Sequence, residues 1–428
     1  MRYHKIDNAL FIKNREKLKQ YLKPNSMVVL NSNDILPTSA DGRLSFIQDS
    51  DIFYFSGIDQ EESTLVLYPD SKEKKHKEIL FLRQTNKDIA RWEGYRYSKD
   101  EAADISGIKT IYWNSEFNNI FKNLIFEAEY VYLNSNEHNR ADFNIETSHD
   151  RFIKWCINKY PLHKFKRLAP VIHELRIQKS SIEIDLIIKS CKITEKSFRR
   201  LLNFVRPGVW EFEIEAEIYH EFLRNRSRCP AFEPIIASGA NTCVLHYIKN
   251  DQQLKDGDLL LLDYGAEYAN YKSDMTRTIP VNGKYTKRQK QIYNSVLNVQ
   301  KKAIQMLFPG NNFEQYNQEI AKIVEEELIK LRLLNPIDVK KQNKNSPLYK
   351  KYFMHSISHY IGLDVHDVGS KYKIFKPGMI FSCEPGIYIQ EESTGIRIEN
   401  DILITENGPV DLMKDIPVQA EEIEDLMN

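Results

Sequence analysis

The sequence predicts two domains, an α/β domain followed by an α+β domain. The chain has 428 residues, more than a single hydrophobic core usually serves. Short β-branched and aromatic segments alternate with helical segments up to about residue 173, and long amphipathic helices alternate with groups of strands after it. We therefore expect an α/β domain over residues 1–173 and an α+β domain over residues 174–428.

Six short segments are predicted to form the strands of the first domain. Each is apolar, rich in β-branched or aromatic residues and bounded by polar stretches, which is the pattern of a strand. They cover residues 27–30, 52–57, 63–69, 78–82, 110–113 and 129–133. Helical segments between them predict an α/β arrangement.

The second domain is predicted to open on a long helix. Ser180 and Glu183 form a capping box, and Pro207-Gly208 ends the apolar periodicity that follows. Further helices are expected over residues 211–225, 286–309 and 313–333. Strands are expected within residues 234–241, 259–268, 275–281, 379–389 and 395–405. The order helices, strands, helices, strands is typical of an α+β domain with two similar halves.

The composition gives no sign of a nucleic-acid or membrane partner. Lys+Arg and Asp+Glu both number 60, so the formal net charge is zero. The longest apolar run, Leu259–Leu262, is too short to cross a bilayer. The five cysteines are scattered without a CxxC pair, and the first residues lack the apolar stretch of a secretory signal. These features predict reduced thiols and a cytoplasmic protein.

Five side chains of the second domain are of the kind that bind divalent cations. They are four carboxylates and one imidazole, namely Asp263, Asp274, His359, Glu384 and Glu399. Oxygen ligands with one nitrogen suit Mn²⁺, Co²⁺ or Zn²⁺. Two such ions about 3.5–4 Å apart can share a water molecule and convert it into a hydroxide nucleophile near neutral pH. The set therefore points to a hydrolase.

Each carboxylate motif also has a simpler explanation when it is taken alone. Asp263 and Asp274 flank a turn between two strands, where aspartate is common, and alone they fit a solvated loop. Glu384 and Glu399 have apolar neighbours, and a carboxylate is costly to bury unless it is paired or bound to a metal. Arg397 is the alternative partner for Glu399.

Three of the eleven histidines fall within one segment, FMHSISHYIGLDVHDVG. They are His355, His359 and His366, and Ser356 replaces the glutamate that an HExxH zinc motif requires. The cluster fits either packed histidines or a site that uses imidazole as a ligand or acid–base group. His246 stands alone after a strand-like run, a setting more typical of a packed or surface histidine.

Together these motifs resemble the pita-bread metallopeptidases, and within them the aminopeptidase P group. The segments LLDYGAEY…SDMTRT, FMHSISHYIGLDVHDVG, CEPGIYI and GIRIENDILIT occur in the order that this family uses. FIQDSDIFYFSGI and AEEIEDLM extend the resemblance to nearly the whole chain. It is weakest over residues 84–170, where RWEGYRY stands out. The resemblance implies a creatinase/aminopeptidase P-like N-terminal domain and a pita-bread catalytic domain.

The resemblance also implies how the ligands are shared. Asp263 binds one metal ion in bidentate fashion, Asp274 and Glu399 bridge two ions, and His359 and Glu384 complete the second site. Mn²⁺ is the expected metal, and Co²⁺ or Zn²⁺ is compatible with the same ligands.

The implied activity is hydrolysis of the N-terminal Xaa-Pro bond of peptides with proline at the second position. Glu384 is expected to accept a proton from the attacking water, and His246 and His366 to bind the substrate and the tetrahedral intermediate. The residues expected to form the proline pocket are His355, Tyr388 and Arg397.

Two residues of the first domain carry weaker expectations. By resemblance, Asp51 and Trp92 reach a neighbouring active site or its entrance, with Asp51 holding the free α-amino group. Asp49 lies two residues from Asp51, so the same motif also fits a purely structural role. A homodimer or homotetramer is expected.

Four alternatives share the fold or part of it. A prolidase has the same ligands and differs in closing its site around the C-terminus of a dipeptide. Methionine aminopeptidases lack an N-terminal domain of this size, and creatinases use no metal, whereas all five ligand positions are present here. A catalytically inactive pita-bread protein that binds a partner is disfavoured by the same five residues and by the neutral net charge.

Overall fold

The computed structural model describes residues 3–142, 144–343 and 345–428. Two compact units divide between Arg176 and Ile177. The first is an α/β unit and the second an α+β unit, which confirms the predicted fold class.

The N-terminal unit is built on one six-stranded sheet in the order β4-β3-β2-β1-β5-β6. Strands β1, β5 and β6 run parallel, β3 and β4 run parallel, and β2 is antiparallel to both of its neighbours. The strands are β1 (Ser26–Asn31), β2 (Thr64–Leu67), β3 (Glu78–Leu82), β4 (Thr110–Trp113), β5 (Tyr130–Leu133) and β6 (Lys164–Arg167).

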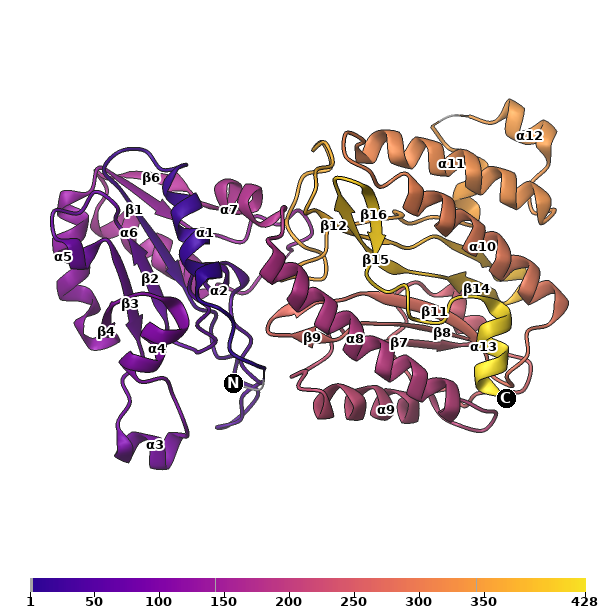
Figure 1. Cartoon of the computed structure of the whole chain (residues 1–428), viewed down its shortest axis with the longest axis horizontal. Coiled ribbons are helices and arrows are strands. Elements are labelled where there is room, and N and C mark those ends of the chain that lie inside the picture. The colour runs from indigo at the N-terminus through magenta and orange to yellow at the C-terminus, as the bar shows by residue number, and fades with distance from the viewer. Residues whose placement is uncertain (1–2, 143, 344) are drawn as a thin grey trace. The chain divides into compact units, whose positions relative to one another are not determined.

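Helices cover both faces of this sheet (Figure 1). The helices are α1 (Ala9–Lys19), α2 (Ser50–Ser56), α3 (Lys87–Glu93), α4 (Lys99–Ser106), α5 (Phe117–Glu127), α6 (Ser148–Lys159) and α7 (Ala169–Arg176). Phe121, Leu124 and Ile125 of α5 and Cys156 of α6 pack against buried residues of β1, β2 and β3. Helix α3 differs from the others because none of its residues is buried.

One predicted strand, over residues 52–57, is wrong, since residues 52–56 lie in helix α2 and Gly57 caps it. The Asp49 side chain accepts hydrogen bonds from the backbone N–H groups of Asp51 and Ile52, and Gly57 ends the helix at a φ of +66°. Residues Ile52–Ser56 are all buried. A short helix that is buried all round has no polar face, so its sequence looks like that of a buried strand. Sequence reasoning also missed β6, because three of its four residues, KFKR, are positively charged.

The C-terminal unit contains two antiparallel three-stranded sheets, β11-β8-β7 and β12-β15-β16. Two hairpins, β9-β10 and β13-β14, complete its strands. The strands are β7 (Ile235–Ser238), β8 (Leu259–Tyr264), β9 (Glu267–Tyr268), β10 (Tyr271–Lys272), β11 (Met275–Pro280), β12 (Ile380–Cys383), β13 (Gly386–Ile389), β14 (Thr394–Arg397), β15 (Asn400–Thr405) and β16 (Gly408–Asp411).

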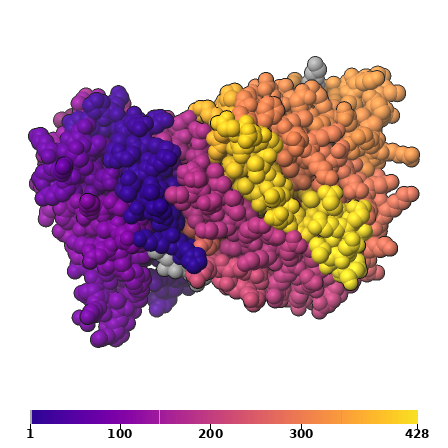
Figure 2. Space-filling model, in the orientation of Figure 1, coloured from indigo at the N-terminus to yellow at the C-terminus, as the bar shows by residue number. Residues whose placement is uncertain are grey.

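Helices lie outside these sheets, with α8 and α9 beside one sheet and α10 and α11 beside the other (Figure 1). They are α8 (Ser181–Phe204), α9 (Glu211–Arg224), α10 (Lys287–Gln305), α11 (Phe313–Lys330), α12 (Pro336–Lys341) and α13 (Ala420–Met427). The α8–α9 segment, magenta in Figure 2, forms part of the surface of this unit. The predicted capping box of Ser180 and Glu183 is present at the start of α8.

Two long predicted strands are each interrupted at a glutamate. The run 379–389 divides into β12 and β13 around Glu384 and Pro385, and the run 395–405 divides into β14 and β15 around Ile398 and Glu399. Each glutamate therefore lies where the chain passes between a three-stranded sheet and the β13-β14 hairpin.

Candidate metal centre and active site

Strand pairing brings three carboxylates to one place. Asp263 lies on β8, and Asp274 directly precedes β11, which pairs with β8 so that Thr276 faces Asp263. Thr276 also forms an isolated β-bridge with Glu399. The two halves of the unit therefore meet at Thr276, with an acidic side chain on either side of it.

His359 is fixed beside β12 by backbone hydrogen bonds. Its N–H donates to Ser382 Oγ at 3.0 Å, and its carbonyl accepts from the N–H of Ser382 at 2.9 Å. The N–H of Glu384 donates to the carbonyl of Ile357 at 2.9 Å. The segment that carries the histidine and the strand that carries Glu384 are thus held together.

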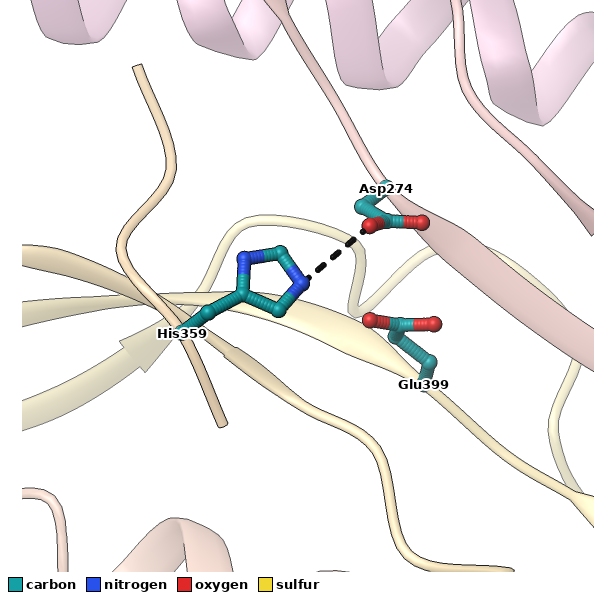
Figure 3. A group of neighbouring side chains, drawn as sticks. All are labelled: Asp274, His359 and Glu399. Carbon is teal, nitrogen blue, oxygen red and sulfur yellow. Dashed lines mark ion pairs between the residues drawn. The ribbon is translucent and has the colours of Figure 1, made fainter. Parts of the chain in front are cut away.

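The imidazole of His359 faces the carboxylates. Its Nε2 lies 3.4 Å from Asp274 Oδ2 and 3.6 Å from Glu384 Oε1. Its Nδ1 lies 3.0 Å from the carbonyl oxygen of Tyr360, which accepts a hydrogen bond when the proton is on Nδ1. This contact leaves Nε2 free as a ligand. Asp274, His359 and Glu399 each offer one ligand atom, and these atoms lie within 4.8 Å of one another (Figure 3).

The carboxylates lack the partners that their burial requires. No described residue donates a hydrogen bond to Asp263 Oδ1, Asp274 Oδ1 or Glu399 Oε1, although all three atoms are buried. Burial raises the pKa of Asp274 well above its usual range, and the nearby Asp263 carboxylate raises it further. Burial and the Asp274 charge act on the pKa of Glu399 in the same direction. Unpaired oxygens and mutually repelling charges around one imidazole fit a divalent cation.

Arg397 has a different partner from the one that the sequence suggested. Its Nη2 lies 2.6 Å from Asp263 Oδ2, and its Nη1 donates to the Tyr388 hydroxyl at 2.8 Å. Glu399 instead accepts a hydrogen bond at 2.7 Å from the Thr276 hydroxyl. Arg397 thus compensates the charge of Asp263. Glu399 is held by a neutral hydroxyl group and not by this arginine.

His355 joins Arg397 and Tyr388 in a hydrogen-bonded row. Its Nε2 lies 2.9 Å from the Tyr388 hydroxyl, and its Nδ1 lies 2.7 Å from the carbonyl oxygen of Ser356. Burial, with the nearby Arg397 charge, lowers the pKa of His355 to about 4. His355 is therefore neutral near pH 7. With its proton on Nδ1 it accepts a hydrogen bond from Tyr388.

The remaining predicted histidines lie next to this group. The rings of His366 and His359 are 4.3 Å apart between centroids and meet edge to face. His246 is exposed, and its charge is one of the causes that lower the pKa of His355. The structure thus brings all four predicted histidines of the C-terminal unit into one neighbourhood.

The predicted residues of the N-terminal unit are described within that unit. Asp51 pairs with Arg176 at 2.7 Å and accepts a hydrogen bond from Asn134 at 2.7 Å. Asp49 caps helix α2. Trp92, on α3, is 88% exposed. The Asp51 carboxylate is thus already engaged, and Trp92 has no packing role within its own unit.

Sequence reasoning missed two residues that support the cluster. The Thr276 hydroxyl donates a hydrogen bond to Glu399. Asp401 Oδ2 accepts a hydrogen bond from the backbone N–H of Asp274 at 3.1 Å. Asp401 is fully buried, and burial raises its pKa well above its usual range. The sequence gives the same indication for Asp401 as for Glu399, because both are acidic residues within the apolar segment GIRIENDILIT.

Comparison with known proteins decides the family. Residues 185–406 match metallopeptidase family M24, and residues 11–132 match the aminopeptidase P N-terminal domain. The chain belongs to the M24 metallopeptidase family. Divalent metal cofactors are characteristic of this family, in agreement with the unpaired carboxylates, and the predicted resemblance is confirmed.

The similarity extends over nearly the whole chain. The Xaa-Pro aminopeptidase of Escherichia coli strain K12 is 35% identical over 99% of this chain and 98% of its own length. Human Xaa-Pro aminopeptidase 3 is 30% identical over 93% of this chain and 80% of its own length. A putative aminopeptidase P from Bacillus anthracis superimposes with a TM-score of 0.91 at 33% identity, covering 99% of this chain and 98% of that one. Across the described residues, no helix is both long and apolar enough to span a bilayer.

The raised pKa of Glu399 predicts the pH dependence of the metal-free protein. A carboxyl group whose pKa is higher in the folded than in the unfolded state stabilises the fold fully below the unfolded value, about 4.3. That contribution is lost as the pH rises through the folded value, by about 1.4 kcal/mol per pH unit between the two. Stripped of metal, the wild type should therefore lose stability relative to Glu399→Gln as the pH rises above the usual carboxyl range. Urea unfolding of both proteins in a chelator measures this difference, and parallel pH curves would contradict it.

Proposed function

We propose that the chain is a metal-dependent aminopeptidase that hydrolyses the N-terminal Xaa-Pro bond of peptides. The observation that carries the proposal is the cluster of Asp274, His359 and Glu399, with unpaired carboxylate oxygens, beside the Arg397–Tyr388–His355 row. It is supported by relatives named Xaa-Pro aminopeptidase that match nearly the full chain.

The residues proposed to hold two divalent cations are Asp263, Asp274, His359, Glu384 and Glu399. Such a pair supplies Lewis-acid chemistry and lowers the pKa of a water molecule toward neutrality. We propose Mn²⁺ as the native metal because the ligands are mostly oxygen atoms. The same oxygen-rich set is compatible with Zn²⁺, and a zinc-substituted aminopeptidase P of Escherichia coli bound to product is among the similar structures, with a TM-score of 0.87.

Glu384 is proposed to accept the proton of the attacking water. Its side chain is 18% exposed, whereas the Glu399 residue is only 2% exposed, so Glu384 is the carboxylate better placed to exchange a proton with substrate or solvent. Ser382 Oγ lies 3.4 Å from Glu384 Oε1, and His355 Nδ1 lies 3.7 Å from Oε2. These contacts orient the carboxylate for proton transfer.

His246 and His366 are proposed to stabilise the oxyanion that develops on the scissile carbonyl. Hydrogen-bond donors placed at such an oxygen in a site shielded from water are among the strongest catalytic contributions. The contact of His366 with His359 supports this role, and the exposure of His246 suits a residue that meets the incoming peptide.

The row of His355, Tyr388 and Arg397 is proposed to receive the proline ring. An Xaa-Pro bond has no N–H, so an enzyme that selects it has no need of an acceptor for that hydrogen. In this row the polar atoms satisfy one another, because Tyr388 bonds to both of its neighbours. The row therefore offers a rigid wall to the ring.

We further propose a homodimer or homotetramer in the cytoplasm. Helix α3 buries none of its residues, and Trp92 on it is 88% exposed, which suits an aromatic residue that reaches the active-site entrance of a neighbouring chain. Asp51 is proposed to contribute to binding the α-amino group while paired with Arg176. All five cysteines are free thiols, as a reducing compartment requires.

Metal-stripped protein should cleave Arg-Pro-Pro after Mn²⁺ is added and should spare Ala-Ala-Ala. The reason is that bound cations would lower the pKa of the attacking water, while the His355–Tyr388–Arg397 row would select proline. Product release followed by chromatography, with and without Mn²⁺, measures both requirements. Cleavage of Ala-Pro alone would identify a prolidase instead, and no cleavage with any divalent metal would overturn the proposed activity.

Glu384→Ala should lower kcat by about 10²–10⁴-fold while the fold survives, because the variant loses its proton acceptor. Glu391→Ala is the matched control, since Glu391 is an exposed glutamate in the same part of the chain that pairs with Lys351. Steady-state kinetics on Arg-Pro-Pro and thermal unfolding of both variants separate catalysis from stability. A Glu384→Ala enzyme with near wild-type kcat would remove Glu384 from the proposed role.

A further inference from the structure

Outside the proposed metal centre, a buried carboxylate lies at Glu211, the first residue of helix α9. Glu211 is fully buried, and its side chain accepts four hydrogen bonds. Its Oε1 accepts from the backbone N–H and the hydroxyl of Ser238, at 2.8 and 2.7 Å. Its Oε2 accepts from the Tyr247 hydroxyl at 2.8 Å and from the backbone N–H of Gln252 at 3.0 Å. These donors replace the water that a carboxylate loses on burial.

The donors to Glu211 all belong to one segment of the chain, residues 238–252. Ser238 is the last residue of β7 and begins the segment, Tyr247 lies within it, and Gln252 ends it. The backbone N–H of Glu211 donates in turn to the carbonyl of Gln252 at 3.0 Å. One residue at the start of α9 therefore holds the beginning, the middle and the end of this segment.

The same segment carries His246, which is exposed. Within residues 244–249, Tyr247 is the only buried residue, and its ring belongs to the apolar cluster that also contains Tyr388. Burial, with the hydrogen bond to Glu211, raises the pKa of Tyr247 above its usual range, so its hydroxyl remains a donor near neutral pH. His246 is therefore held in place through its neighbour Tyr247 and not by burial of its own ring.

Helix α9 gives Glu211 a rigid base. The carboxylate lies at the N-terminus of a 14-residue helix, where the helix dipole stabilises a negative charge. Ile214, Ile218 and Phe222 of α9 are fully buried and fix the helix to the C-terminal unit. The restraint on residues 244–249 therefore comes from a packed helix.

We infer that Glu211 is a positioning residue for His246 and acts through the Tyr247 hydroxyl. The inference rests on the proposed function, in which His246 stabilises the oxyanion. A hydrogen-bond donor of that kind accelerates the reaction only when it is held where the negative charge develops, and a displacement of about 1 Å can cost about 10²-fold in rate. Glu211 is fully buried, so its effect on the reaction is indirect.

Tyr247→Phe tests the inference with little disturbance, because it removes one hydroxyl and keeps the packed ring. Its kcat on Arg-Pro-Pro should fall about tenfold with little change in KM, as expected when a group that acts in the transition state is displaced. Tyr293→Phe is the matched control and should keep the wild-type kcat. Tyr293 is also buried, and its hydroxyl donates to the carbonyl of Val418 at 2.9 Å.

A double-mutant cycle with His246→Ala separates positioning from a merely structural role. If Tyr247 acts through His246, Tyr247→Phe should lower kcat no further once the imidazole is absent. An equal fold reduction with and without His246 would overturn the inference. An impaired His246→Ala enzyme beside an unimpaired Tyr247→Phe enzyme would refute the inference alone. Wild-type kcat for His246→Ala would refute the proposed role of His246 and, with it, the inference.

Hydrogen exchange of the full chain, followed by mass spectrometry, gives a readout besides activity. Peptides covering residues 244–252 should exchange faster in Tyr247→Phe, because the segment opens more often without this hydrogen bond. Glu211→Gln should have the same effect, since its NH₂ group cannot accept a hydrogen bond. Tyr293→Phe should exchange there like the wild type. Unchanged exchange in Tyr247→Phe would overturn the inference.

Discussion

The C-terminal unit buries several carboxylates whose charge the rest of the protein does not neutralise, and its structure depends on how those charges are compensated. Removing a carboxylate from water costs several kcal/mol unless an opposite charge or hydrogen bonds replace the solvent. Arg397 compensates Asp263, yet one buried oxygen of each of Asp263, Asp274 and Glu399 accepts no hydrogen bond from the described residues. Such an arrangement is stable in a folded protein when cations occupy the space between the oxygens. The fold is therefore best understood as a scaffold for metal ions.

The two sheets of the unit each contribute two of the five proposed ligands. Asp263 and Asp274 come from the β8–β11 pair, and Glu384 and Glu399 come from the points where the chain leaves β12 and enters β15. The β-bridge between Thr276 and Glu399 joins the two halves at the centre. Asp401 fixes the backbone of Asp274 from the second sheet. The four carboxylates lie on strands or beside strand ends, and hydrogen bonds to Ser382 hold His359 next to β12, so the site is held more rigidly than free loops would allow.

Much of this could be predicted from the sequence, and the exceptions have physical causes. The five proposed ligand positions stand in linked motifs, and the capping box at Ser180 marks the start of α8. Helix α2 was mistaken for a strand because all of residues Ile52–Ser56 are buried, which removes the periodicity on which such predictions rest. The pairing of Arg397 with Asp263 rather than Glu399 depends on contacts between distant strands, which sequence spacing does not encode.

The most direct measurement is calorimetric titration of the metal-stripped protein with Mn²⁺, alongside Glu399→Ala. If the buried carboxylates form a centre for a pair of cations, the wild type should bind two ions per chain near neutral pH. Loss of Glu399, a proposed bridging ligand, should weaken binding of both. Wild-type protein that binds no divalent ion, or a Glu399→Ala variant with unchanged binding, would contradict this account of the structure.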